Sequence, residues 1–107
     1  MKTQKFFIAI MALTFSTIAI AANKTETIKV SGNCEMCESK IEKAAKIVGV
    51  VKADWSTKTK LLTLVYDPKK VKSDDVQKKI AAVGYDTPKF KATSAVYNAL
   101  PGCCKYR

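Results

Sequence analysis

Histidine is absent from this 107-residue chain, and methionine is scarce. Of the three methionines, Met1 and Met11 fall in the N-terminal segment and only Met36 falls in the rest of the chain. Without imidazole, the chain cannot build histidine-based metal sites, and general acid–base or nucleophilic catalysis by a Cys–His pair is excluded. Methionine-rich metal sites are excluded as well.

Four cysteines remain as strong ligands for a metal ion, and they occur in two pairs: Cys34 with Cys37, and Cys103 with Cys104. Any tight metal site must therefore be built from thiolates. Thiolates favour Cu(I), Hg(II), Cd(II) or Zn(II) over hard cations.

Long apolar runs are also missing, with one exception near the N-terminus. The run 6–20 follows Lys2 and Lys5 and ends at Ala19-Ile-Ala21, a small-x-small pattern typical of a signal-peptidase site. The run is short for a membrane span, so an uncleaved anchor is the weaker alternative. We expect residues 1–21 to be a signal peptide and the mature protein, starting near Ala22, to be periplasmic or secreted, with no later membrane span.

Acidic residues are few, 9 against 19 lysines and arginines, which gives a formal charge of +10. Residues 22–107 keep 17 basic residues against 9 acidic ones, a charge of +8. A basic surface favours acidic partners. Nucleic acid is not expected as a partner, because the protein is predicted to be exported and lacks the aromatic signature of a strand-binding sheet.

The 86 residues after the predicted signal peptide suffice for one small domain, residues 22–92, followed by a cysteine-containing tail, residues 93–107. Alternating apolar and polar residues, or short apolar runs, predict strands at 25–31, 51–55, 61–66 and 86–92.

Helical spacing connects two further sets of residues: Cys37, Ile41, Ala44 and Val48, and then Val76, Ile80 and Val83. Ser73 is a suitable N-cap for the second helix. The order β-α-β-β-α-β predicts an α+β ferredoxin-like sandwich, in which two helices cover one face of a four-stranded antiparallel sheet. The expected strand order is 4-1-3-2, with the strand that contains Pro88 at an edge.

The Cys34-Glu-Met-Cys37 motif places one thiol in a loop and the other at a helix start, so both sulfurs can face one point. That arrangement suits a soft metal ion or a redox disulfide. A structural disulfide between Cys34 and Cys37 is a further alternative.

Several motifs in this order resemble the heavy-metal-associated domain family. They are Gly32-Asn-Cys-Glu-Met-Cys37, Ile41-Glu42, Ala44-Ala45, Val48-Gly49-Val50 and Ala82-Val83-Gly84-Tyr85. The family includes copper chaperones, metal-binding domains of copper and zinc ATPases, and the periplasmic mercury-binding protein. The resemblance covers about residues 25–91. It implies that Cys34 and Cys37 bind a soft ion in near-linear two-coordination, with Tyr85 near the metal loop.

The approach to the first cysteine departs from the family pattern, which is usually Gly-Met-Thr-Cys. Here Gly32 is followed by Asn33 and then Cys34, so the approach is one residue shorter and lacks the Met that plugs the core beneath the site. We expect Met36 to fill that space from the other side. We expect Glu35 and Asn33, which flank the first cysteine, to admit borderline ions such as Zn(II).

The tail can reach the Cys34/Cys37 site even if the fourth strand carries the chain to the far end of the domain. The 11 residues from Ala92 to Cys103 span ~36–40 Å when extended, against ~20 Å for one strand. A bridge between the adjacent Cys103 and Cys104 is disfavoured by ring strain. Three alternatives follow for the tail thiols: they are accessory ligands that complete a four-thiolate site with Cys34 and Cys37, they form a second metal-loading site, or they belong to a disordered end that cross-links to another chain.

The sequence as a whole predicts an exported, non-enzymatic carrier or scavenger of a soft ion, with Cu(I) favoured over Hg(II) or Zn(II). The ion would pass to a membrane metal transporter or efflux component by thiolate exchange. The alternatives are a periplasmic thiol–disulfide oxidoreductase and a structural zinc domain in which the tail completes a four-cysteine site.

Overall fold

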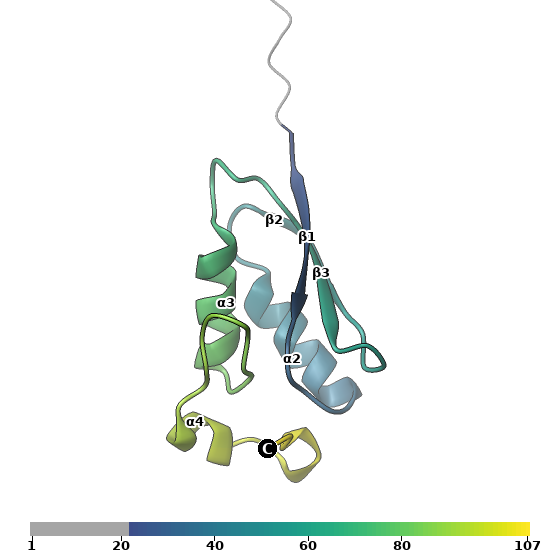
Figure 1. Ribbon diagram of the computed structural model, residues 1–107, viewed down its shortest axis with the longest axis vertical. Coiled ribbons are helices and arrows are strands. Elements are labelled where there is room, and N and C mark those ends of the chain that lie inside the picture. The colour runs from purple at the N-terminus through teal and green to yellow at the C-terminus, as the bar shows by residue number, and fades with distance from the viewer. Residues whose placement is uncertain (1–21) are drawn as a thin grey trace, which may run out of the picture.

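The computed structural model of the protein describes residues 22–107, so the predicted signal peptide lies outside the described residues. Within this range no helix is long and apolar enough to cross a membrane. Its elements, in chain order, are β1 (Lys24–Lys29), α2 (Glu35–Ala45), β2 (Val50–Trp55), β3 (Leu61–Tyr66), α3 (Ser73–Ala82), the short α4 (Ser94–Asn98) and the 3-10 turn η3 (Gly102–Cys104) (Figure 1).

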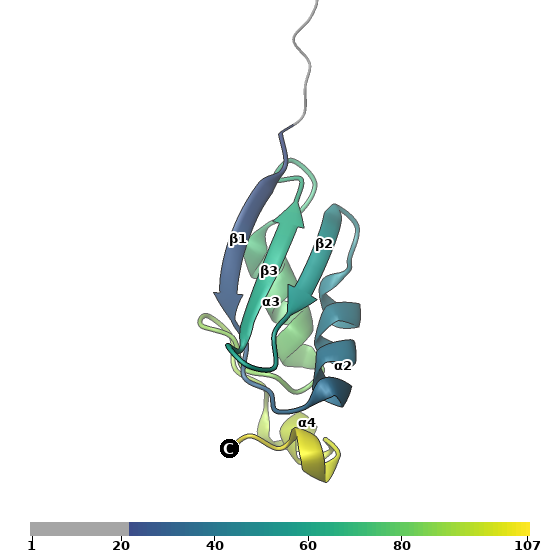
Figure 2. The same ribbon diagram turned by 90° about the vertical axis from the view of Figure 1, so that its right-hand side faces the viewer.

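The three strands form an antiparallel sheet in the order β1-β3-β2, which matches the predicted order for these strands. The central strand β3 pairs with β1 through Ile28 opposite Leu62 and with β2 through Trp55 opposite Leu62. Leu62 and Leu64 are fully buried, because α2 and α3 cover one face of the sheet (Figure 2). The predicted helix-on-sheet arrangement is confirmed.

Two valines that the sequence pattern assigned to element faces lie at the surface. Val48 is 85% exposed, because α2 ends at Ala45 and the chain then turns through Gly49, whose φ of +98° suits glycine. Val51 is 57% exposed, because the register of β2 shifts between Val50 and Lys52, and this bulge turns Val51 away from the core.

The second helix differs from its prediction at both ends. Ser73 is its first helical residue and Lys72 its N-cap, where the sequence pointed to Ser73 as the cap. The Lys72 N–H donates to the Asp75 carboxylate at 3.1 Å, which satisfies the helix start without a serine cap. Val83 lies just past the helix and is 40% exposed, so it does not continue the buried face of Val76 and Ile80.

The fourth strand predicted at residues 86–92 is not present in the described chain, which has three strands. The segment bonds to itself instead: the Thr87 N–H donates to the Phe90 carbonyl at 2.8 Å, and the Ala92 N–H donates to the Asp86 carboxylate at 2.8 Å. Side chains of this kind compete with sheet pairing for backbone groups, and Pro88 has no N–H to offer. One bond, from the Ser31 N–H to the Asp86 carbonyl at 3.0 Å, links the segment to the end of β1.

Because Asp86 and Ala92 are joined, this loop returns the chain to the end of the domain where α2 begins. The tail therefore starts beside the Cys34 loop (residues 30–34, between β1 and α2). It does not need to double back along the sheet, as the predicted topology required. Figure 1 shows α4 and the C-terminus at that end.

The tail is folded, contrary to the alternative of a disordered end. Tyr97, Leu100 and Cys104 are all at least nine-tenths buried. Leu100 packs on Gly84, where a Cβ atom would lie 2.7 Å from the Leu100 Cδ2 atom, and Gly84 has a φ of +114°. Position 84 thus requires glycine for two reasons: its φ is positive, and a side chain there would occupy the space that Leu100 of the tail fills.

We predict that Gly84→Ala destabilises the protein, since alanine strains a positive φ and clashes with Leu100. The expected loss is about 1–3 kcal/mol of unfolding free energy, measured by urea denaturation. Gly102→Ala is the matched control, because nothing lies within 4 Å of a Cβ atom there. Equal midpoints for the two variants would contradict the assigned role of Gly84.

Candidate metal centre

Cys34 and Cys37 lie where the chain leaves the β1 end and enters α2. The carbonyl of Cys34 accepts the Cys37 N–H at 2.9 Å and the Glu38 N–H at 3.1 Å, which forms the first turn of α2. The Cys34 N–H points at the Cys37 sulfur, 3.5 Å away. The positive end of the helix therefore faces the sulfurs and favours their thiolate forms.

Cys37 is fully buried on the same face of α2 as Ile41, whereas Cys34 is half-buried at the rim. The two sulfurs lie 3.6 Å apart. The spacing that the sequence predicted, two thiols facing one point, is present in the structure.

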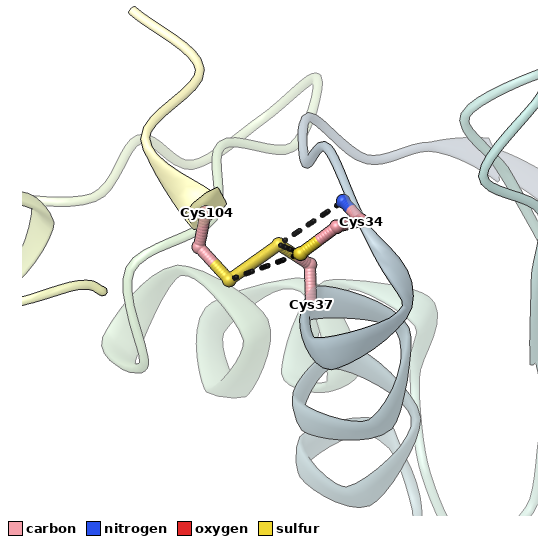
Figure 3. A group of neighbouring side chains, drawn as sticks. All are labelled: Cys34, Cys37 and Cys104. Carbon is pink, nitrogen blue, oxygen red and sulfur yellow. Dashed lines mark hydrogen bonds between the residues drawn. A yellow bond between two sulfur atoms is a disulfide. The ribbon is translucent and has the colours of Figure 1, made fainter. Parts of the chain in front are cut away.

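Cys104 joins this pair from the tail. It is fully buried in η3 and forms a disulfide with Cys37, with Cα atoms 5.7 Å apart (Figure 3). Cys34 Sγ lies 4.0 Å from Cys104 Sγ, so Cys34 faces both atoms of the disulfide. The described chain thus contains a Cys37–Cys104 bond and not the Cys34–Cys37 bond that the redox and structural alternatives require.

Cys103 is exposed, and its sulfur lies 3.2 Å from Cys34 Sγ and 4.0 Å from the Met36 sulfur. Cys34 and Cys103 are the free cysteines of the structure. The tail thus divides the sulfurs into a buried pair, Cys37 and Cys104, and an outer pair, Cys34 and Cys103.

Polar contacts hold the tail over the Cys34 loop. The Asn33 side chain donates to the Lys105 carbonyl at 2.7 Å. The Tyr106 hydroxyl donates to the Gly84 carbonyl at 2.7 Å and accepts from the Asp86 N–H at 3.0 Å. Asn33, which the sequence marked as a departure from the family pattern, therefore fixes the tail.

Arg107 and Asp86 form an ion pair that the sequence reasoning missed. The Arg107 guanidinium donates to the Asp86 carboxylate at 2.9 Å and to the Ala92 carbonyl at 2.8 Å, and it lies over the Tyr97 ring. Burial opposes ionisation of Asp86, yet the hydrogen bonds that its carboxylate accepts from Arg107 and from the Ala92 N–H keep the pKa of this carboxyl below the ordinary value. No local pattern could have paired these residues, since they are 21 positions apart in sequence.

The outer thiols have unequal acidities. Two hydrogen bonds lower the pKa of Cys34. The bond with Cys103 has the largest effect, and the bond with the backbone N–H of Cys37 has the next largest. The hydrogen bond between Cys34 and Cys103 also raises the pKa of Cys103, because one proton is shared between the two sulfurs. Cys34 is therefore the thiol of this pair that ionises first.

Tyr85 is fully buried, and it is near enough to Cys34 and Cys103 to interact with their charges. Its hydroxyl has no hydrogen-bond partner among the described residues. Burial, and then the charges of Cys34 and Cys103, raise the pKa of Tyr85, so it keeps its proton as a neutral neighbour of the thiols.

Met36 does not fill the core beneath the loop, as the sequence suggested. It is 49% exposed. Trp55 takes the space instead: a Cβ atom on Gly32 would lie 3.1 Å from the Trp55 ring and 3.2 Å from Ile41. The Trp55 indole N–H donates to the Val30 carbonyl at 3.0 Å, which fixes the ring under the loop.

The chain is similar to a known protein family and to a curated protein. A family model described as heavy-metal-associated domain matches residues 27–86. A zinc-transporting ATPase of Synechocystis sp. is 38% identical over 72 residues, which are 65% of this chain and 10% of that protein. The chain thus spans about a tenth of the length of that curated relative.

Solved structures give the same likeness. CopZ metallochaperone superimposes with a TM-score of 0.58 at 32% identity, covering 60% of this chain and 98% of that one. Oxidized MerP from Ralstonia metallidurans CH34 has a TM-score of 0.58 at 31% identity, covering 62% and 94%. The soluble region of the P-type ATPase CopA from Bacillus subtilis has a TM-score of 0.60 at 31% identity, covering 64% and 47%.

We predict that Cys34 reacts with iodoacetamide at lower pH than an ordinary thiol, since the thiolate is the reactive form and its pKa is lowered. Unreduced protein is suitable, because only Cys34 and Cys103 are free there. Substoichiometric labelling followed by peptide mass spectrometry across a pH series gives the inflection.

Cys103→Ala should move the Cys34 inflection to higher pH, because the largest cause of the lowered pKa is lost. Ser39→Ala, on the exposed side of α2, serves as the control and should leave it unchanged. An unshifted inflection in Cys103→Ala would disprove the shared proton.

Proposed function

The chain belongs to the heavy-metal-associated domain family, and on that basis we propose that it is a non-enzymatic carrier or scavenger of a soft metal ion, bound by the thiolates of Cys34 and Cys37. The observation that carries this proposal is the pair of sulfurs 3.6 Å apart at the start of α2. Two thiolates at a helix N-terminus suit a soft monovalent or divalent ion.

Cu(I) is the favoured cargo, followed by Hg(II) and Zn(II). The absence of histidine leaves sulfur as the dominant donor, and thioether and thiolate donors select Cu(I). Among the similar proteins, one from Bacillus anthracis str. Ames is described as a putative copper-ion-binding protein and the Synechocystis protein as a zinc-transporting ATPase, so the relatives include proteins named for each of these two metals.

Loading requires Cys37 in its reduced form. A dithiol reductant supplies two electrons and two protons to the Cys37–Cys104 disulfide and becomes a disulfide itself. The thiols of Cys34 and Cys37 then lose their protons to the solvent when the ion binds.

Release of the ion follows by thiolate exchange, one ligand replaced at a time. Cys34 is the accessible member of the pair, whereas Cys37 is fully buried. An incoming thiolate from a partner therefore meets the ion on the Cys34 side. The partner we propose is a membrane metal transporter or efflux component with an acidic docking surface, which the net charge of +8 on residues 22–107 would attract.

We also propose export to the periplasm or cell exterior, with residues 1–21 removed as a signal peptide. The basis is the apolar run 6–20 that follows Lys2 and Lys5, together with the small-x-small pattern Ala19-Ile-Ala21. Intact-mass analysis of protein from an extracytoplasmic fraction should give an N-terminus near Ala22. A protein retained in the cytoplasm with residues 1–21 attached would overturn this assignment.

For metal binding itself, we predict that replacing both Cys34 and Cys37 by alanine abolishes stoichiometric Cu(I) binding while the domain stays folded. The reason is that both sulfurs of the proposed primary site are removed. Anaerobic competition between phosphine-reduced protein and a chromophoric Cu(I) chelator measures the affinity, and circular dichroism checks the fold.

Ser39→Ala is the matched control on the same helix, since Ser39 is exposed to solvent and carries no soft ligand. It should bind Cu(I) as the unaltered protein does. Full Cu(I) affinity in the double cysteine variant would rule out the proposed site.

A further inference from the structure

We propose that Cys104 is a third thiolate ligand of the same ion, so that the folded tail closes the metal site. This inference rests on the proposed function, and it goes beyond the two-thiolate site that the family resemblance implies. It also assigns the two adjacent tail cysteines different roles: Cys104 binds the ion, and Cys103 does not.

The positions of the sulfurs fit one three-coordinate ion. The sulfurs of Cys34, Cys37 and Cys104 all lie within 4.8 Å of one another. Cys34 Sγ is 3.6 Å from Cys37 Sγ and 4.0 Å from Cys104 Sγ. An ion with metal–sulfur bonds of ~2.3 Å in a trigonal plane needs sulfurs ~4 Å apart. After reduction of the disulfide, a small separation of Cys37 from Cys104 completes that triangle.

Burial also favours Cys104 as a ligand. Cys37 and Cys104 are both fully buried, and Cys34 is half-buried at the rim. A thiolate left alone in such surroundings is costly, whereas a bound cation offsets its charge. The ion would thus sit with its inner side toward Cys37 and Cys104 and its outer side toward Cys34.

The tail presents Cys104 from a folded segment and not from a free end. Leu100 packs on Gly84, Asn33 binds the Lys105 carbonyl, and Arg107 pairs with Asp86. These contacts lie on both sides of Cys104 in sequence. A ligand held in place before the ion arrives loses little freedom on binding, which strengthens its contribution.

Cys103 has a different environment although it is the adjacent residue. It is exposed, its sulfur contacts Cys34 and Met36, and it does not belong to the three-sulfur group. The neighbouring cysteine therefore provides a control of the same residue type in the same tail.

A third thiolate changes how the ion is released. With two ligands, one of them accessible, an incoming thiolate can displace the ion directly. With Cys104 bound, the incoming thiolate must also displace the docked tail. The reduced protein should hence retain Cu(I) more strongly, and give it up more slowly, than the same domain without Cys104.

The test compares unaltered protein, Cys104→Ala, Cys104→Ser and Cys103→Ala, all reduced by a phosphine without oxygen and loaded with one equivalent of Cu(I). X-ray absorption counts the sulfurs bound to Cu(I), and competition with a chromophoric chelator gives affinity and transfer rate. Cys104→Ser keeps the size of the side chain, so a folding defect in the alanine variant does not decide the outcome.

We expect three bound sulfurs in the unaltered protein and in Cys103→Ala, and two in both Cys104 variants. Affinity in the Cys104 variants should fall by about tenfold or more, with faster transfer to the chelator. Two sulfurs in the unaltered protein, or equal losses in Cys103→Ala and Cys104→Ser, would overturn the inference. A two-sulfur site lost in the Cys34/Cys37 variant would leave the proposed function intact, whereas no Cu(I) binding by the unaltered protein would end both.

Discussion

The burial of Cys37 is the constraint on which the sulfur cluster depends. The residue lies on the inner face of α2 with Ile41, fully buried, so its sulfur is part of the hydrophobic core and is not accessible to a partner. Every sulfur that shares an ion or a bond with Cys37 must therefore come to it. Cys34 arrives from the loop before α2, and Cys104 arrives from the tail.

The elements that the sequence predicted well are those with uninterrupted periodicity. Leu62 and Leu64 alternate cleanly in β3, and Val76 and Ile80 keep helical spacing in α3, so their burial follows from pattern alone. The exposure of Val51 was not predicted, because the alternation of apolar and polar residues does not reveal a β-bulge. The strand expected around Pro88 failed because Asp86 and Thr87 side chains bind the local backbone in place of a neighbouring strand.

The sequence was enough to predict the ligand type of the candidate site, but not how the tail comes to lie over it. The spacing of Cys34 and Cys37 specifies two convergent thiols, and the missing histidine leaves no competing donor of similar strength. The approach of the tail was anticipated from chain length, but the route was wrong, because the loop tied by Asp86 and Ala92 leaves the tail already at the site. The pairing of Arg107 with Asp86 depends on tertiary distance, which no local pattern encodes.

The disulfide and the metal ion compete for Cys37, and this links the oxidation of the protein to its cargo. The Cys37–Cys104 bond spans 67 residues, and a cross-link over such a loop stabilises a folded chain by about 4 kcal/mol in the chain-entropy model. An ion bound to the reduced site stabilises the reduced form by its own binding free energy. Each form therefore opposes the other, because bound ion makes Cys37 harder to oxidise and the disulfide removes Cys37 from the metal site. The contacts of Asn33, Leu100 and Arg107 do not involve sulfur, so they can hold the tail in place in both forms.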